Sequence, residues 1–174
     1  MPLEIPGARH LHSGKVRDLY EVEDNNLLMV GVHIAHDCVI GDNTTFSNNA
    51  QVAGHVSVGD WAVLGGFTGV QQRVRIGAHA FVGGGSVVLQ DVPPFVTVQG
   101  YPAKPHGTNN EGLRRRGFTA DDILAVRRAY KTLYREGLAL EDAKAALAAA
   151  ATAAPVLRPL VDFLAVASTL GIIR

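Results

Sequence analysis

Residues 33–64 read HIAHDCVIGDNTTFSNNAQVAGHVSVGDWAVL, and an aliphatic or aromatic residue returns at every sixth position of this stretch. The series continues unbroken beyond it as Ile34, Ile40, Phe46, Val52, Val58, Leu64, Val70, Ile76, Val82 and Val88. A small residue often follows each member, and a second column of mostly small or β-branched residues lies four positions after each member. A strict six-residue period over this length is typical of hexapeptide parallel β-helices.

The period therefore predicts a left-handed parallel β-helix, in which two residues of each hexad point inward and the small residue sits at the corner. We expect this β-helix to span residues 28–98, after a non-repeat leader at 1–27. Prolines and glycines after residue 98 predict a loop over 99–108. A small α-helical domain is expected over 109–174, with one helix capped by Thr119 and Asp122, a second from Leu140 to about Ala151, and a third starting between Pro155 and Pro159.

The composition narrows the functional class. Among 174 residues, Lys plus Arg number 16 and Asp plus Glu number 16, and this balance argues against a general nucleic-acid binder. The only cysteine, Cys38, excludes an internal disulfide and favours a reducing, cytoplasmic location. No run of 18 apolar residues predicts a transmembrane helix, and Met1–Gly14 does not resemble an apolar signal stretch.

His36 and Gly54 are the first candidates for chemistry. They are 18 residues apart, or three hexads, so they should stack on neighbouring coils. An imidazole beside a backbone N–H suits acyl transfer, because the base removes a hydroxyl proton and the N–H stabilises the oxyanion. Asp37 can set the tautomer of His36. The alternatives are a solvated surface histidine and a zinc site that includes His33, His36 and His55.

Three adjacent arginines, Arg114, Arg115 and Arg116, precede the Thr119 helix. Guanidinium groups bind phosphates in a bidentate manner, so the run is suited to clamp a diphosphate. The alternative is a solvated basic turn.

Several motifs resemble UDP-N-acetylglucosamine O-acyltransferase of lipid A biosynthesis over about residues 26–174. They are HIAHDCVIG (33–41), AGHVSVGDWAVLGG (53–66), IGAHAFVGGGS (76–86), QDVPPFV (90–96) and NEGLRRRGF (110–118). The resemblance implies transfer of a 3-hydroxyacyl chain from acyl carrier protein to the 3-hydroxyl of UDP-N-acetylglucosamine. It also implies a homotrimer with active sites between subunits, no cofactor and no integral membrane insertion.

By the same resemblance, His36 is the general base, Asp37 its neighbour and Gly54 the oxyanion-hole amide. The implied substrate-binding residues are His33, His55, Gln72, Gly84, Asn109, Glu111, Arg115 and Arg116, with Gly84 at the position that limits acyl-chain length. Gln71 and Pro102 stand where the family usually has histidine.

The front of the chain departs from the family, which carries further N-terminal coils with residues that contact the sugar nucleotide. Residues 11–30 instead resemble the N-terminus of phosphoribosylaminoimidazole-succinocarboxamide synthase. The acyltransferase is the expected function, and a weak or inactive form of it stays open because those coils are missing. Two alternatives stay open: a non-catalytic trimeric scaffold from a misjoined product, and a zinc enzyme like the hexapeptide carbonic anhydrases.

Overall fold

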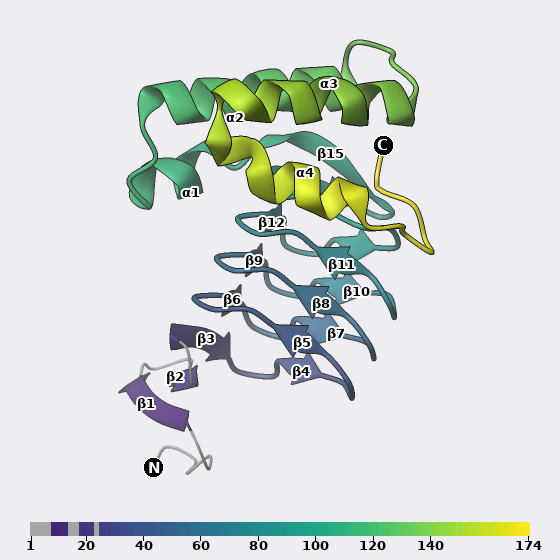
Figure 1. The fold of residues 1–174 in the computed structure, drawn as a ribbon. Helices are drawn as coiled ribbons and strands as arrows, with labels where there is room; N and C mark the ends of the chain where they lie inside the picture. The colour runs from purple at the N-terminus through teal and green to yellow at the C-terminus, as the bar shows by residue number, and fades with distance from the viewer. Residues whose placement is uncertain (1–7, 14–17, 23–24) are drawn as a thin grey trace.

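The structure, a computed structural model, describes residues 8–13, 18–22 and 25–174. It confirms the predicted β-helix of hexapeptide repeats followed by a C-terminal helical domain (Figure 1). The coils stack along one axis, the helices cover one end of the stack, and the N-terminal strands lie at the other end.

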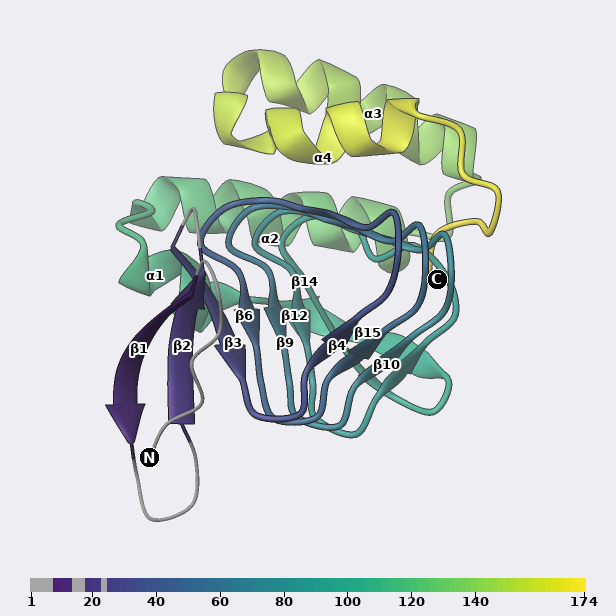
Figure 2. The same ribbon diagram turned by 90° about the horizontal axis from the view of Figure 1, so that it is seen from below.

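Each coil has three flat faces (Figure 2). The first face is built from β1 (Ala8–Ser13), β2 (Asp18–Val22), β3 (Asn26–Met29), β6 (Thr45–Phe46), β9 (Val63–Leu64), β12 (Phe81–Val82), β14 (Val96–Gly100) and β15 (Ala103–Thr108). The second face contains β4 (His33–Ile34), β7 (Gln51–Val52), β10 (Gly69–Val70) and β13 (Val87–Val88). The third face contains β5 (Val39–Ile40), β8 (Ser57–Val58) and β11 (Arg75–Ile76).

Strands of neighbouring coils pair in parallel with a register of 18 residues, as the three-hexad coil predicts. Phe46 lies beside Leu64, and Leu64 lies beside Val82. Both predicted inward columns are buried from Phe46 onward, so the core is a stack of aliphatic and small side chains. The last coil is two residues shorter, since Phe81 pairs with Thr97.

The prediction that the small residue of each hexad sits at the corner of the coil is wrong, because the corner lies further along the hexad. The backbone turns with positive φ two residues later, at Asp37, Asn43, Asn49, His55, Trp61, Phe67, Arg73 and His79. The residue that follows each inward aliphatic residue must be small for another reason, which is that the backbone of the next coil comes close to it. A Cβ atom on Gly59 would lie 2.6 Å from the Ala78 nitrogen, and one on Gly65 would lie 2.5 Å from the Gly84 nitrogen.

The segment 99–108, expected as a loop, belongs largely to an antiparallel hairpin. β14 and β15 pair from Val96–Thr108 to Gly100–Ala103 and extend the first face. The Gly100 and Pro102 signals mark its tight turn, and Pro105 is tolerated because β15 is the edge strand. At the opposite end β1, β2 and β3 pair antiparallel, and β3 joins β6 in parallel. Within the stretch 11–30, residues 14–17 and 23–24 lie outside the described residues.

The helical domain opens with a short helix α1 (Asn110–Arg115), which was not predicted as a separate helix and which contains two of the three arginines. Its N-cap is Asn109, whose side chain accepts from the Gly112 N–H. α2 (Ala120–Tyr134) begins with the predicted capping box of Thr119 and Asp122. α3 (Leu140–Ala153), the 3₁₀ turn η2 (Pro155–Leu157) and α4 (Arg158–Ala165) complete the domain. Among the described residues, no helix has the length and apolar character needed to span a bilayer.

Two tyrosines of α2, Tyr130 and Tyr134, pack on the β-helix core. Their hydroxyls are buried and lack a hydrogen-bond partner among the described residues, and burial raises the pKa of Tyr134 above its ordinary 10.0.

Because the unfolded phenol ionises near pH 10 and the folded one does not, the free energy of unfolding should fall above pH 10, by about 1.4 kcal/mol per pH unit. Tyr134→Phe should remove this alkaline loss and leave stability at pH 7 unchanged or higher.

Urea unfolding at pH 7 and near pH 11 measures this effect, with Tyr101→Phe as the control because Tyr101 is exposed. An equal alkaline loss in the Tyr134→Phe protein and the parent would contradict the prediction.

Candidate functional site

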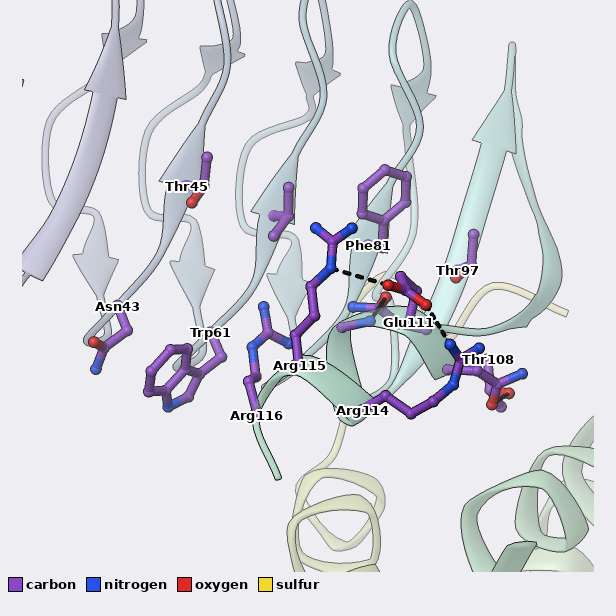
Figure 3. A pocket seen from close by; sticks show the side chains of 14 residues that line it. Asn43, Thr45, Trp61, Phe81, Thr97, Thr108, Glu111, Arg114, Arg115 and Arg116 are labelled. Carbon is purple, nitrogen blue, oxygen red and sulfur yellow. Dashed lines mark hydrogen bonds and ion pairs between the residues drawn. The ribbon is translucent and has the colours of Figure 1, made fainter. Parts of the chain in front are cut away.

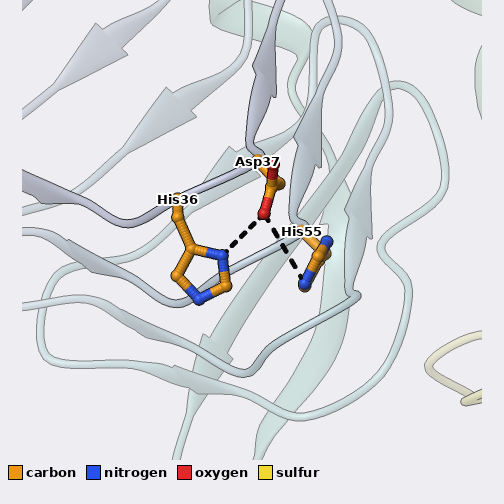
Figure 4. A group of neighbouring side chains, drawn as sticks. All are labelled: His36, Asp37 and His55. Atoms are coloured by element: carbon orange, nitrogen blue, oxygen red, sulfur yellow. Dashed lines mark hydrogen bonds and ion pairs between the residues drawn. The ribbon is translucent and has the colours of Figure 1, made fainter.

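Three of the predicted site residues, His36, Gly54 and Gln72, stack on successive coils at one corner. Each lies in a turn that links a second-face strand to a third-face strand. Asp37 and His55 follow directly and adopt the left-handed backbone with φ of 59° and 60°. Asp and His adopt this conformation more readily than most residues, so the same two side chains suit the turn and are candidates for catalysis. We call this group the His36 corner (Figure 4).

The His36 imidazole is held by its neighbour. His36 Nδ1 lies 2.8 Å from Asp37 Oδ2, and His55 Nε2 lies 3.9 Å from the same oxygen. The His36 and His55 rings meet edge to face at 5.0 Å. The hydrogen bond from His36, followed by the charges of His55 and His36, lowers the pKa of Asp37. An ionised Asp37 accepts the Nδ1–H of His36 and leaves the lone pair of Nε2 free to take a proton.

Gly54 lies directly against that free nitrogen. A Cβ atom at Gly54 would be 2.8 Å from both Nε2 and Cε1 of His36. The Gly54 carbonyl accepts the Arg73 N–H, whereas the Gly54 N–H has no acceptor among the described residues. The corner therefore offers a base and an unused N–H donor side by side, which are the two elements that acyl transfer needs.

The zinc alternative receives less support from the same geometry. His36, Asp37 and His55 offer ligand atoms within 4.8 Å of one another, and His33 is not in this group. A tetrahedral zinc ion with bonds of about 2.1 Å needs ligand atoms about 3.4 Å apart. Here one pair is in direct hydrogen-bond contact at 2.8 Å and another is 3.9 Å apart.

A second candidate site is a groove of about 780 Å³ between the first face and α1, which we call the Arg116 groove (Figure 3). Its lining residues are Asn43, Thr45, Trp61, Val63, Phe81, Thr97, Thr108, Asn109, Asn110, Glu111, Gly112, Arg114, Arg115 and Arg116. Glu111 pairs with both Arg114 and Arg115. The groove gathers the predicted nucleotide-end residues Asn109, Glu111, Arg115 and Arg116.

The two sites occupy different parts of one protomer. The His36 corner joins the second and third faces, whereas the Arg116 groove lies along the first face and its corner with the third. Gly84 lies at the remaining corner, between β12 and β13, and His33 is exposed on β4. A single chain thus brings the base and oxyanion residues together and the nucleotide residues together, but not the two sets.

Trp61 and His79 were not predicted as site residues. Trp61 lines the groove, and the His79 ring stacks on Trp61 behind it. These residues are 18 apart and occupy the same corner position in successive coils. The three-hexad period therefore contained the signal that places them one above the other.

The three-faced coil and its turn residues define a hexapeptide-repeat β-helix, and residues 20–54 match the family model for the bacterial transferase hexapeptide. Residues 91–173 match the model for domain 2 of UDP N-acetylglucosamine O-acyltransferase. Over most of its length, the chain is homologous to the acyl-[acyl-carrier-protein]–UDP-N-acetylglucosamine O-acyltransferases.

The curated relatives include the enzyme of that name from Thiobacillus denitrificans, 56% identical over 91% of this chain and 61% of the relative. The counterpart from Aliivibrio fischeri is 53% identical over 94% of this chain and 63% of the relative. The chain thus spans about three-fifths of the length of these relatives.

Solved structures of UDP-N-acetylglucosamine acyltransferases are similar as well. The structure from Moraxella catarrhalis matches with a TM-score of 0.81 and 40% identity, over 86% of this chain and 58% of that one. The structure from Francisella novicida gives 0.80 and 40%, over 83% and 53%.

Proposed function

We propose that this chain carries the acyltransferase activity of its relatives. It would move a 3-hydroxyacyl group from acyl carrier protein to the 3-hydroxyl of UDP-N-acetylglucosamine in lipid A synthesis. The contact of His36 with Asp37 and Gly54 carries the proposal, because it supplies a base and an oxyanion donor. The high identity to enzymes named for this reaction supports the choice of substrates.

In the proposed reaction, His36 Nε2 takes the proton of the sugar 3-hydroxyl as its oxygen attacks the thioester carbonyl. The tetrahedral oxyanion accepts the Gly54 N–H. The carbon–sulfur bond then breaks, the ester forms, and the carrier thiolate leaves with the proton that His36 returns. Asp37 stabilises the imidazolium between these steps.

We further propose that the active site forms between protomers of a homotrimer. Within one protomer the His36 corner and the Arg116 groove lie at different corners of the coil. A substrate that reaches both must therefore contact two chains, and threefold symmetry would place a corner of one protomer against a groove of the next in all three sites.

Replacing His36 with alanine should lower turnover by about 10²–10⁴-fold, since the proton of the acceptor hydroxyl then has no base. The assay supplies UDP-N-acetylglucosamine and 3-hydroxyacyl carrier protein and measures the acylated sugar nucleotide. His106→Ala is the matched control, because His106 is an exposed histidine on β15 outside both sites. Light scattering gives the oligomeric state of each variant. A parent protein with no more turnover than the His36→Ala variant would contradict the proposed activity and favour the scaffold alternative.

A further inference from the structure

The three arginines at the groove have unequal partners. Arg114 and Arg115 share the Glu111 carboxylate, with Arg115 Nε 3.0 Å from Oε1 (Figure 3). Arg116 pairs with no carboxylate in the described part of the chain. It is also less exposed than the other two, and burial lowers its pKa. Of the three, Arg116 therefore keeps its charge uncompensated for an anionic ligand.

His79 and Trp61 hold Arg116 from the β-helix side. Arg116 donates through an Nη atom to His79 Nδ1 at 3.3 Å, and its Cζ lies 5.2 Å from the Trp61 ring centre. The His79 ring is stacked between Trp61 and Phe95, at 6.5 Å and 5.6 Å. The Phe118 ring packs edge to face with the His79 ring, with their centres 5.0 Å apart. The imidazole is thus fixed on both faces and on one edge, and one nitrogen accepts from Arg116.

The surroundings keep His79 in the state that accepts this hydrogen bond. Burial and the positive charge of Arg116 lower the pKa of His79 to about 4, against an opposing effect of Asp60. The ring is therefore neutral at pH 7 and does not repel the guanidinium. The backbone of the same residue supports the other end of α1, since Asn109 donates to the His79 carbonyl and accepts from the Gly112 N–H.

We propose that His79 is a positioning residue, which acts through Arg116 and orients its guanidinium toward the diphosphate of the nucleotide in the groove. This inference rests on the proposed function for the identity of the ligand. His79 itself does not line the groove, so its effect on ligand binding passes through Arg116.

UDP and uridine are the probes, since they share a base and a sugar but differ in the diphosphate. Trp61 is the only tryptophan of the chain and lines the groove, so its fluorescence reports binding. Arg116→Ala should weaken UDP binding by roughly tenfold or more, the loss expected for a hydrogen bond to a charged group. His79→Phe keeps the aromatic stack but removes the acceptor, and should weaken UDP binding several-fold.

The double variant separates positioning from damage to the fold. His79→Phe should have little further effect in an Arg116→Ala background, should leave uridine binding unchanged, and should be rescued in part by His79→Gln, which retains an acceptor. The inference would be overturned if the losses of UDP affinity from His79→Phe and Arg116→Ala were additive. It would also be overturned if His79→Phe weakened the binding of uridine and UDP equally, or if Arg116→Ala left UDP binding unchanged. Coupled UDP binding without turnover would retain the inference and contradict only the proposed activity.

Discussion

Gly54→Ala should reduce acyl transfer by at least a hundredfold while the β-helix stays folded. The new methyl group would meet Nε2 and Cε1 of His36 at 2.8 Å, well inside van der Waals contact. The imidazole must then rotate away from Asp37 or the turn must shift. Displacement of a catalytic group by about 1 Å costs on the order of a hundredfold in rate, and loss of an oxyanion donor costs 10²–10³-fold.

The stability of the same variant should change by less than about 1 kcal/mol. The His36 side chain is 73% exposed, so its ring can turn into solvent without opening the core. Gly69→Ala is the matched control, because a methyl group there meets its nearest neighbour at an ordinary 3.9 Å.

Turnover and the urea midpoint, measured on the same samples, test both halves of the prediction. In a His36→Ala background, Gly54→Ala should lower the remaining rate much less than it does in the parent. Full activity of the single variant would show that His36 and Gly54 do not act together.

The repeat made much of this structure predictable. Because each hexad forms one face, the spacing of 18 between His36 and Gly54 places them on neighbouring coils before any coordinates are known. The same arithmetic applies to Trp61 and His79. It fails in the last coil, where Phe95 follows His79 by 16 residues and still stacks on it. The shortening has no local sequence signal beyond Pro93 and Pro94.

The partners of the arginines were less predictable. Glu111 lies three and four residues before Arg114 and Arg115, a spacing that favours ion pairs on a helix, but α1 was not expected there. Arg116 contacts residues 37 and 55 positions earlier in the chain, which only the packing of α1 on the β-helix brings near. The separation of the His36 corner from the Arg116 groove likewise follows from the order of the three faces around the coil, and no sequence motif indicates it.

The attachment of the helical domain to the last coil depends on a buried ion pair between Arg75 and Asp91. Asp91 accepts the Arg75 backbone N–H at 2.8 Å and its Nε at 2.7 Å, and its side chain is only 2% exposed. The Arg75 guanidinium then reaches the carbonyls of Phe163 and Val166 at the end of α4 and lies 4.5 Å over the Phe163 ring. The backbone of Asp91 also bonds to the C-terminal segment through Gly171 and Ile173.

Asp91→Ala should therefore lower the free energy of unfolding by about 3–5 kcal/mol, since it leaves a largely buried guanidinium without its counter-charge. The double variant Arg75→Met/Asp91→Leu should recover part of this loss, because it removes the unpaired guanidinium, although the Arg75 backbone N–H loses its acceptor. Glu141→Ala, which breaks the exposed pair with Lys144, is the control and should cost less than about 1 kcal/mol. Urea unfolding, monitored by circular dichroism at one protein concentration, gives the free energy of unfolding of all three variants. A loss for Asp91→Ala no larger than that of Glu141→Ala would mean that apolar packing alone fixes α4, whereas recovery in the double variant would assign the loss to the uncompensated charge.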